Sequence, residues 1–342
     1  MFSLADPTPP IQAPQGHEGH SGHGGMAMPP AADRGVNWDS LSAWHPSAGW
    51  LMAIVVLASI YLYAVLVLHR RGVAWPVGRT IAWLLGLGTL VLVTSTGLAS
   101  YGMTLFSVHM AQHMVLSMLT PIFLLLGAPI TLALRTLPAG SRYGAPRRFL
   151  LTALHSRFAR VISHPGFTVT AFVVSLYALY FTDLLDLAMR THVGHQLMLI
   201  HFLAVGLLFF GPILAIDPWP RRSSPGLRLI ELLVAVPFHA FFGVIVMQTA
   251  YPLSATFAAS TTALGLDPLA DQATGGGIAW GFGETPIVLV TVVVFIQWVR
   301  TDARAARRFD RQAARDGDAA LAAYNAKLQR LNQSADSARG TA

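Results

Sequence analysis

The chain has 342 residues, of which 54% are hydrophobic and only 11% are charged, with a formal net charge of +7. Soluble domains carry about 25% charged residues. This composition, with a mean hydropathy of +0.53, therefore excludes an ordinary soluble protein and predicts an all-α polytopic membrane protein. The sequence has no cysteine, which excludes thiolate metal sites, disulfides and CxxC redox chemistry. A soft metal ion would have to be bound by methionine sulfur and histidine nitrogen.

Residues 1–48 form a segment rich in proline, glycine and alanine, without periodicity, which predicts a disordered tail. The segment has no basic region followed by an apolar one, so we expect no cleavable signal peptide. Flexible histidine and methionine tracts can capture copper, and a low-complexity spacer is the alternative. The tract here consists of His17, His20, His23, Met26 and Met28.

Seven segments are apolar enough to cross a bilayer, because a membrane helix needs about 20 mostly apolar residues. A bundle of seven transmembrane helices over residues 49–299 places the two termini on opposite sides. The third segment contains Pro121, and Gly127–Leu134 prolongs it to Arg135. The predicted spans are Gly49–Leu68, Thr80–Ala99, Met103–Leu126, Gly166–Thr182, Thr191–Ala215, Leu229–Ala250 and Ile278–Val299.

The basic residues predict the orientation of this bundle. With the N-terminus outside, all but Arg34 and Arg190 of the 23 basic residues fall on the inner side. Because cytoplasmic loops carry an excess of Lys and Arg, we predict a multi-pass protein of the cell membrane with a cytoplasmic C-terminus. The same residues are suited to contact anionic lipid in the bilayer, and their distribution argues against a nucleic-acid partner.

The third span carries two histidines one helical turn apart. His109 and His113 lie about 9 Å and about 15 Å below its outer end, at about 1.5 Å per residue. The i, i+4 spacing places both imidazoles on one face of the helix. Met103, Met110 and Met114 form a neighbouring stripe. Imidazoles flanked by thioethers suit Cu(I), and Cu(II) if a carboxylate or water joins them.

The fifth span has histidines and methionines that recur every three residues, from Met189 to His201. Three residues fall short of one helical turn, so these side chains cannot share one face. We expect His192 and His195 to pair near the outer surface, with His201 deeper on another side. Span six adds His239 near mid-depth. Ionisable groups inside spans indicate function, but a membrane histidine can also simply bond a neighbouring helix, and methionine stripes are often packing.

The segment before span seven, Leu264–Ile278, is predicted to be an outer loop with a glycine-rich turn. Asp271 in this loop, or Glu284 in the next span, would orient a ligating imidazole in the way that carboxylates near metal sites do. A polar loop and an ordinary span-starting acid are the alternatives. Asp183 and Asp186 on another outer loop are interpreted as surface acids. No nucleophile–base arrangement or nucleotide motif occurs, so we expect no enzymatic activity.

The tail from residue 300 to residue 342 carries charges of both signs among Ala, Leu and Tyr. This mixture predicts a partly helical cytoplasmic tail, solvated or interfacial and broken near Gly317. It contains no chemistry that we can identify.

Four motifs of this sequence resemble the CtaG family of multi-pass membrane cytochrome c oxidase assembly factors, in their actinobacterial form. They are the HMAQHM motif that begins at His109, the span-five histidines, GPILAIDPWP (Gly211–Pro220) and ADQATGGGIAWGFGETP (Ala270–Pro286). The resemblance covers roughly residues 44–332. It implies a role in maturing a haem–copper oxidase by supplying copper to its catalytic subunit. The motif histidines of the family map to His109 and His113, and then to His192 and His195. Gly194 departs from the acidic residue that relatives carry before the second span-five histidine.

We therefore predict an assembly factor that binds copper near the outer leaflet and passes it to the oxidase catalytic subunit. His109 and His113 would anchor the site. The alternatives are a membrane copper transporter, a haem-binding redox protein and a scaffold without metal. His192 and His195 would complete this site. Cu(I) would be relayed by Met103, Met110 and Met114. A deeper site would be formed by His201 and His239.

Overall fold

The computed structural model describes residues 38–138, 140, 144–221, 223–315, 317 and 319–340. Within these ranges the regular elements are all helices, and the only β feature is an isolated antiparallel bridge between Trp44 and Thr96. The predicted all-α class is therefore confirmed for the described residues. The predicted capture tract, His17 to Met28, lies outside them.

The helices follow one another with short connections, as is usual for a helical bundle. Seventeen elements are described in chain order. They are α1 (Trp38–Ser42), α2 (Ala48–Arg70), α3 (Val77–Ser95), α4 (Gly97–Tyr101), α5 (Phe106–Met114), the π-helix η2 (Val115–Leu119), α6 (Thr120–Leu126), α7 (Pro129–Thr136), α8 (Ala145–His155), α9 (Arg157–Ile162), α10 (Pro165–Tyr180), α11 (Leu184–Met189), α12 (His192–Leu214), α13 (Pro225–Gln248), α14 (Ala255–Ala263), α15 (Pro268–Arg315) and α16 (Ala319–Gly340).

Six of the predicted spans coincide with helical segments long and apolar enough to cross a membrane. These segments are α2, α3, the run from α5 to α7, α12, α13 and α15. The fourth predicted span forms α10, an apolar helix of 16 residues. At about 1.5 Å per residue it is about 24 Å long, somewhat shorter than a hydrocarbon layer of about 30 Å. Six spans are thus supported by length and composition, and the seventh stays a prediction.

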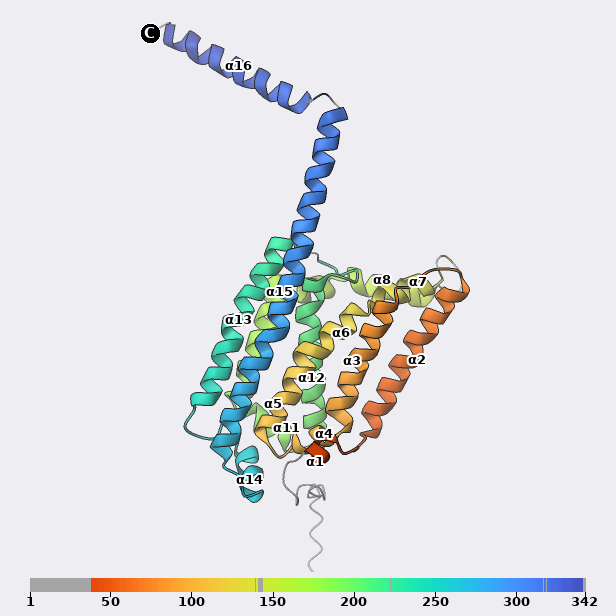
Figure 1. Cartoon of the computed structure of the whole chain (residues 1–342), viewed down its shortest axis with the longest axis vertical. Coiled ribbons are helices and arrows are strands. Elements are labelled where there is room, and N and C mark those ends of the chain that lie inside the picture. The colour runs from red at the N-terminus through yellow and green to blue at the C-terminus, as the bar shows by residue number, and fades with distance from the viewer. Residues whose placement is uncertain are drawn as a thin grey trace, which may run out of the picture.

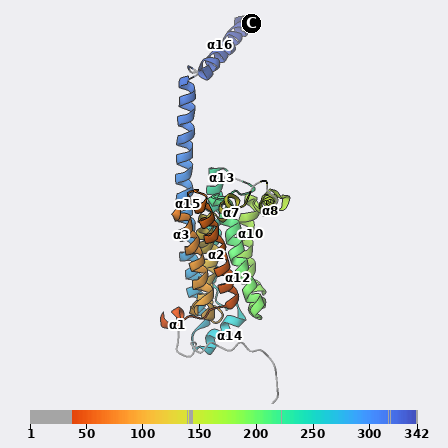
Figure 2. The ribbon, with the colours of Figure 1, turned by 90° about the vertical axis from the view of Figure 1, so that its right-hand side faces the viewer.

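The helices form a flattened bundle. In Figure 1, α13, α15, the α5–α6 pair, α3 and α2 follow one another across the molecule, and each packs against the next. Figure 2 shows α10 and α12 behind this row, where α12 packs on α6 and η2, and α10 packs on α12 and α13. One end of the bundle carries α1, α4, α11 and α14 and is called the α11 end. The opposite end carries α7 and α8 and is called the α8 end.

The third predicted span is not one regular helix. The π-helix η2 follows α5 directly, and Pro121 lies one turn further on, in α6. Proline has no N–H to donate to the carbonyl of Ser117, four residues before it, which is a physical reason for the irregular turn. Ala128 then adopts a left-handed conformation with φ +51°, so that α7 is a separate helix instead of a continuation.

The predicted loop with a glycine-rich turn before span seven is wrong, because α15 already begins at Pro268. Its glycines lie at helix contacts. A Cβ on Gly275 would lie 2.7 Å from a ring carbon of Phe106, and one on Gly276 would lie 2.7 Å from the backbone nitrogen of Met247. Small residues let membrane helices approach this closely, so the glycine run indicates packing and not a turn.

Three aspartates hold the bundle together by capping helices that are remote in sequence. Asp271 accepts a hydrogen bond of 2.7 Å from the backbone N–H of Phe106 at the start of α5. Asp217 accepts one of 2.7 Å from Thr131 in α7, and Asp186 accepts one of 3.1 Å from Thr256 in α14. The first N–H groups of a helix have no partner inside it, so a carboxylate there satisfies them and complements the helix dipole. Asp186 is therefore more than a surface acid.

The last two helices extend beyond the bundle. α15 has 48 residues, which correspond to about 72 Å, and its C-terminal half stands clear of the other helices in Figure 1. Gly317, with φ +57°, separates it from α16. The predicted break near this glycine is confirmed, and the residues of this extension are almost all exposed.

The arginines of the bundle are distributed unequally between its two ends. The caps Asp186 and Asp271 lie at the α11 end, where Arg190 is the one arginine among the described residues. The α8 end collects the other described arginines of the bundle. These are Arg70, Arg71, Arg79, Arg135, Arg147, Arg148, Arg157, Arg160, Arg221 and Arg228.

Candidate functional site: buried histidines and a pocket at the α11 end

The two histidines of α5 are positioned by contacts of that helix with α15 and α3. Asp271 caps it, and the Gln112 side chain donates a 2.7 Å hydrogen bond to the carbonyl of Val93 in α3. Gln112 packs on Gly102, where a Cβ would meet its side-chain oxygen at 1.8 Å. α5 is thereby anchored to α15 and α3, and its remaining polar side chains, His109 and His113, are directed into the bundle, where both are buried.

His109 is fully buried in an aromatic environment. Its ring centroid lies 5.2 Å from that of Phe257, 5.9 Å from Tyr180 and 6.1 Å from Phe202. Neither ring nitrogen makes a geometric hydrogen bond with a described residue, although the backbone of Gly102 lies near enough to interact with the ring. Leaving a buried polar group unpaired costs about 1–3 kcal/mol. His109 is therefore a polar group that packing alone does not explain.

His113 has a different environment one turn deeper. Its ring stacks on Phe202 at 3.8 Å between centroids, and its Nδ1 lies 2.9 Å from the hydroxyl of Tyr180. Tyr180, at the end of α10, is fully buried. A hydrogen bond of this kind to a neighbouring helix is a common structural role for a membrane histidine.

His195 of α12 is the nearest candidate partner of His109. The two imidazoles lie within electrostatic range of each other. His195 is buried, and neither of its ring nitrogens has a hydrogen-bond partner in the part of the chain that the structure describes. The third and fifth predicted spans therefore direct two unpaired imidazoles to the same region. Such a pair could share a metal ion, because imidazole nitrogen suits copper.

A pocket of about 620 Å³ at the α11 end is lined by His195 of this pair. Histidine, methionine and polar side chains from four chain segments line it. They include His45, Trp50, Thr94, Met103, Thr104, Met189, His192, His195 and Gln196. Three imidazoles and two thioethers are donors that suit copper. No three of the described His, Asp or Glu side chains are grouped closely enough to hold one ion together.

Several of these pocket residues were not found from the sequence. His45 lies before α2 and is held against α3 by its backbone N–H, which donates a 2.9 Å hydrogen bond to Ser95. Trp50 donates to the side-chain oxygen of Gln196, whose amide lies 3.4 Å from Nε2 of His192. In the sequence His45 is an isolated histidine between a tail and a span, and only folding of residues 44–47 over the end of α3 brings it to the pocket.

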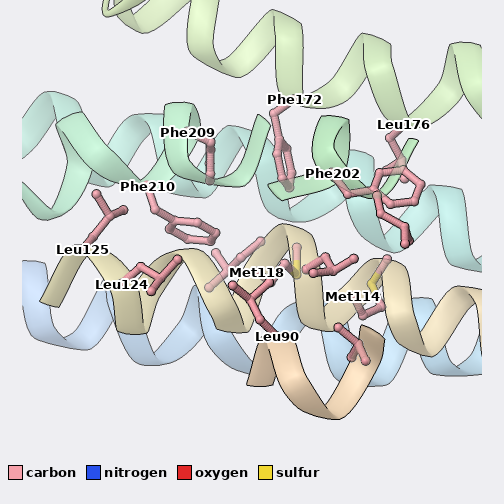
Figure 3. Close-up of a cluster of buried hydrophobic side chains, with 14 of the residues drawn as sticks. Leu90, Met114, Met118, Leu124, Leu125, Phe172, Leu176, Phe202, Phe209 and Phe210 are labelled. Atoms are coloured by element: carbon pink, nitrogen blue, oxygen red, sulfur yellow. The ribbon is translucent and has the colours of Figure 1, made fainter. Parts of the chain in front are cut away.

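The other predicted ligands lie in different places. Met110 and Met114 are fully buried in the hydrophobic core, and Figure 3 shows Met114 near Leu176 and Leu90 within a cluster of apolar side chains. His192 lines the pocket and is exposed, whereas His201 is exposed on the outside of α12. The structure therefore does not gather the predicted histidines and methionines into one group.

His239 lies deeper in the bundle. Its ring packs on Gly283 of α15, where a Cβ would lie 1.9 Å from the imidazole. A void of about 10 Å³ separates it from His113 and is also lined by Ser117 and Ser175. Successive imidazoles from the pocket inward lie within electrostatic range of each other. Their order is His192, His195, His109, His113 and His239.

The two carboxylates that were expected to orient an imidazole have other partners. Asp271 caps α5, and Glu284 accepts a 2.9 Å hydrogen bond from the indole of Trp280. Both roles follow from the early start of α15, which begins at Pro268 where a loop was predicted. Asp271 therefore lies beside the first turn of α5, and Glu284 lies one helical turn after Trp280.

Substituting Asp271 tests its role as a cap. Asp271→Ala is expected to lower the stability of the protein by about 0.5–2 kcal/mol, because α5 loses its capping acceptor. Asp271→Asn should retain part of the stability, since its one amide oxygen can still accept the hydrogen bond from the N–H of Phe106. Thermal unfolding in detergent measures both. If the aspartate instead orients a copper ligand, Asp271→Asn would lose copper at unchanged unfolding temperature.

Comparisons with known proteins add family information to this geometry. The sequence model of the family described as cytochrome c oxidase caa3 assembly factor (Caa3_CtaG) matches residues 59–301. That range includes all of the buried histidines described above. No solved structure matches the chain.

Similar curated proteins come from mycobacteria. The chain is 46% identical over 297 residues to uncharacterized proteins of Mycobacterium bovis and Mycobacterium tuberculosis, which covers 86% of this chain and 45% of each relative. It is 45% identical over 284 residues to an uncharacterized protein of Mycobacterium leprae, which covers 82% of this chain and 43% of the relative. The chain thus spans less than half the length of these relatives.

Proposed function

This chain belongs to the cytochrome c oxidase caa3 assembly factor family, and we propose that it binds copper at the α11 end and helps to deliver it to the catalytic subunit of a haem–copper oxidase. The resemblance recognised from its motifs is confirmed by the family match. The observation that carries the copper proposal is the pair His109 and His195. Both imidazoles are buried, they lie within electrostatic range of each other, and all four of their ring nitrogens lack partners among the described residues.

A soft metal ion would give these two buried imidazoles a partner for a ring nitrogen. A neutral imidazole has one lone pair to donate, and coordination to copper would replace the missing hydrogen bond at that nitrogen. Met103 and Met189 on the pocket wall add thioether sulfur, which selects Cu(I). A site with a few weak ligands suits a protein that must release the copper ion again, whereas a site with a complete set of tight ligands would retain it.

The order of the imidazoles supports transfer by ligand exchange. An ion that enters the pocket would meet exposed His192 first, then His195 and His109, and finally His113 and His239. Each step would exchange one nitrogen donor for the next in this order. The oxidase, docked at the α11 end, would receive the ion from the pocket after the same exchanges in reverse.

Orientation is part of the proposal. With the arginine-rich α8 end in the cytoplasm, as the positive-inside rule favours, the pocket opens toward the outer face. Copper would then be bound near the outer leaflet without crossing the membrane. This arrangement separates the proposal from a copper transporter, which needs a continuous route between the two ends.

Oxidase activity in cells tests the function. In a strain whose only copy of the gene encodes the His109→Ala/His195→Ala variant, we expect normal membrane levels of the variant and at least about tenfold lower oxidase activity. Copper added to the medium should partly restore that activity, because mass action replaces assisted delivery. A scaffold without metal predicts unchanged activity in this strain.

Two further measurements distinguish copper delivery from copper transport and from haem redox chemistry. Copper accumulation inside vesicles that contain the purified protein would favour a transporter, and an absorption band of bound haem would favour a redox protein. Either result would overturn copper delivery as proposed here.

A further inference from the structure

A second pocket lies at the α8 end of the bundle, opposite the histidines. It has a volume of about 550 Å³. α9, the first turns of α10 and the segment between α12 and α13 contribute its walls. The lining residues are Arg157, Arg160, Val161, His164, Phe167 and Arg221.

The positive charges of this pocket have no counter-charge among the described residues. None of the three guanidinium groups forms an ion pair or hydrogen bond with a described residue. Asp217, the acid on the same connecting segment, is already occupied by the N-terminus of α7. His164 uses Nδ1 to accept a 3.1 Å hydrogen bond from Gly166, and this bond directs its other ring nitrogen away from the backbone of α10. All three arginines are exposed, and like charges that line one pocket still repel one another, so an anion bound there would be favourable.

The chemistry of the pocket selects the kind of anion. The planar fork of arginine matches the oxygens of phosphate and binds them with paired hydrogen bonds. Arg157 and Arg160 lie three residues apart on α9, and Arg221 comes from another segment, so that two segments contribute arginines to one pocket. Val161 and Phe167 form an apolar side of the same pocket. A ligand with both a phosphate and an apolar part fits this combination.

The surroundings place the pocket at a membrane surface. α8 and α9 expose large apolar side chains, with Phe149 76% and Phe158 73% exposed, and Val161 also exposed. Figure 1 shows α8 lying across the end of the bundle instead of along it. A helix with exposed aromatic residues and several arginines is typical of an element that lies in the headgroup region.

We propose that this pocket binds the phosphate of an anionic phospholipid, with Arg157, Arg160 and Arg221 as its ligands. The acyl chains of the lipid would follow Phe167 and the apolar surface of α10. In the orientation proposed above, the lipid belongs to the inner leaflet, where anionic headgroups attract basic segments. The site does not depend on copper, because it lies at the other end of the molecule.

Native mass spectrometry of the full chain in detergent, with added phosphatidylglycerol or phosphatidylcholine, tests this site. The wild type should retain phosphatidylglycerol in preference to phosphatidylcholine. The variant Arg157→Gln/Arg160→Gln/Arg221→Gln should bind phosphatidylglycerol at least about tenfold more weakly, because three phosphate contacts are lost. The matched control Arg304→Gln/Arg307→Gln/Arg308→Gln removes equal charge from the exposed part of α15 and should retain wild-type binding.

Three outcomes would overturn the proposal. Equal losses in the pocket variant and the control would indicate unspecific charge attraction. Equal retention of the two lipids by the wild type would exclude headgroup recognition. Displacement of the lipid by an equal concentration of inorganic phosphate would indicate a site for free anion. If the triple variant does not fold, Arg221→Gln alone, which lies outside any helix, gives the same comparison with a smaller expected loss.

Discussion

Purified protein carrying His109→Ala and His195→Ala is expected to contain no copper under conditions in which the wild type retains it. Both imidazoles of the pair are then gone, and the described residues offer no third histidine or carboxylate grouped with them. The unfolding temperature should fall only modestly, because the packing lost in two cavities is partly offset by the removal of buried polar groups that lack hydrogen bonds. Elemental analysis and thermal unfolding of the same samples measure the two effects together.

The matched control for this experiment is His69→Ala/His155→Ala. Both residues are exposed, and both lie at the α8 end, away from the pocket. The control should bind copper as the wild type does. Copper retained in full by His109→Ala/His195→Ala would remove the basis of the proposed site, and a large fall in its unfolding temperature would assign these histidines a structural role.

Gly206→Ala is expected to have the largest effect on stability. In α12, a Cβ at this position would lie 2.1 Å from the carbonyl oxygen of Ser117 and 2.5 Å from the ring of Pro121. The contact is with backbone, so the two helices must separate. Overpacking of this kind costs about 1–3 kcal/mol, and occasionally more. Separation would also shift His195 on α12 relative to His109, so copper affinity should fall together with the unfolding temperature.

Gly88→Ala in α3 is the appropriate comparison. No atom lies within 4 Å of a Cβ built at that position. Alanine is favoured over glycine in a helix by about 1 kcal/mol, so this variant should be as stable as the wild type or more stable. If Gly206→Ala unfolds at the same temperature as Gly88→Ala, α12 and η2 do not approach as closely as described.

Much of the architecture follows from local sequence patterns. The apolar runs predicted six segments that the structure bears out by length and composition, since a bilayer dictates their length. The break at Gly317 was predictable, because alternating charges end there at a residue that readily adopts positive φ. The i, i+4 spacing of His109 and His113 predicted that both imidazoles share one face of the helix, and the structure buries both side chains.

Errors arose where a local pattern has two physical causes. The glycines near residue 275 are compatible both with a turn and with close contact between helices. The structure shows that they make helix contacts, because Phe106 and Met247 lie beside them. The position of Asp271 in the sequence is compatible both with orienting an imidazole and with capping a helix. In the structure it caps α5, because the N-terminus of that helix lies beside it. Neither neighbour is near in sequence.

The amino-acid sequence by itself determined that this is a helical membrane protein, where six of its membrane-crossing helical segments lie, and that several of its histidines lie inside apolar segments. Periodicity and hydropathy are properties of consecutive residues, so they suffice for those conclusions. Only the tertiary structure decided that His109 and His195 lie within electrostatic range of each other, that His45 lines the same pocket as His195, and that Met114 is core packing. These outcomes depend on the rotation and the spacing of helices that are distant in the chain. Contacts such as that of Gly206 with Ser117 set this spacing, and no local sequence pattern specifies such contacts.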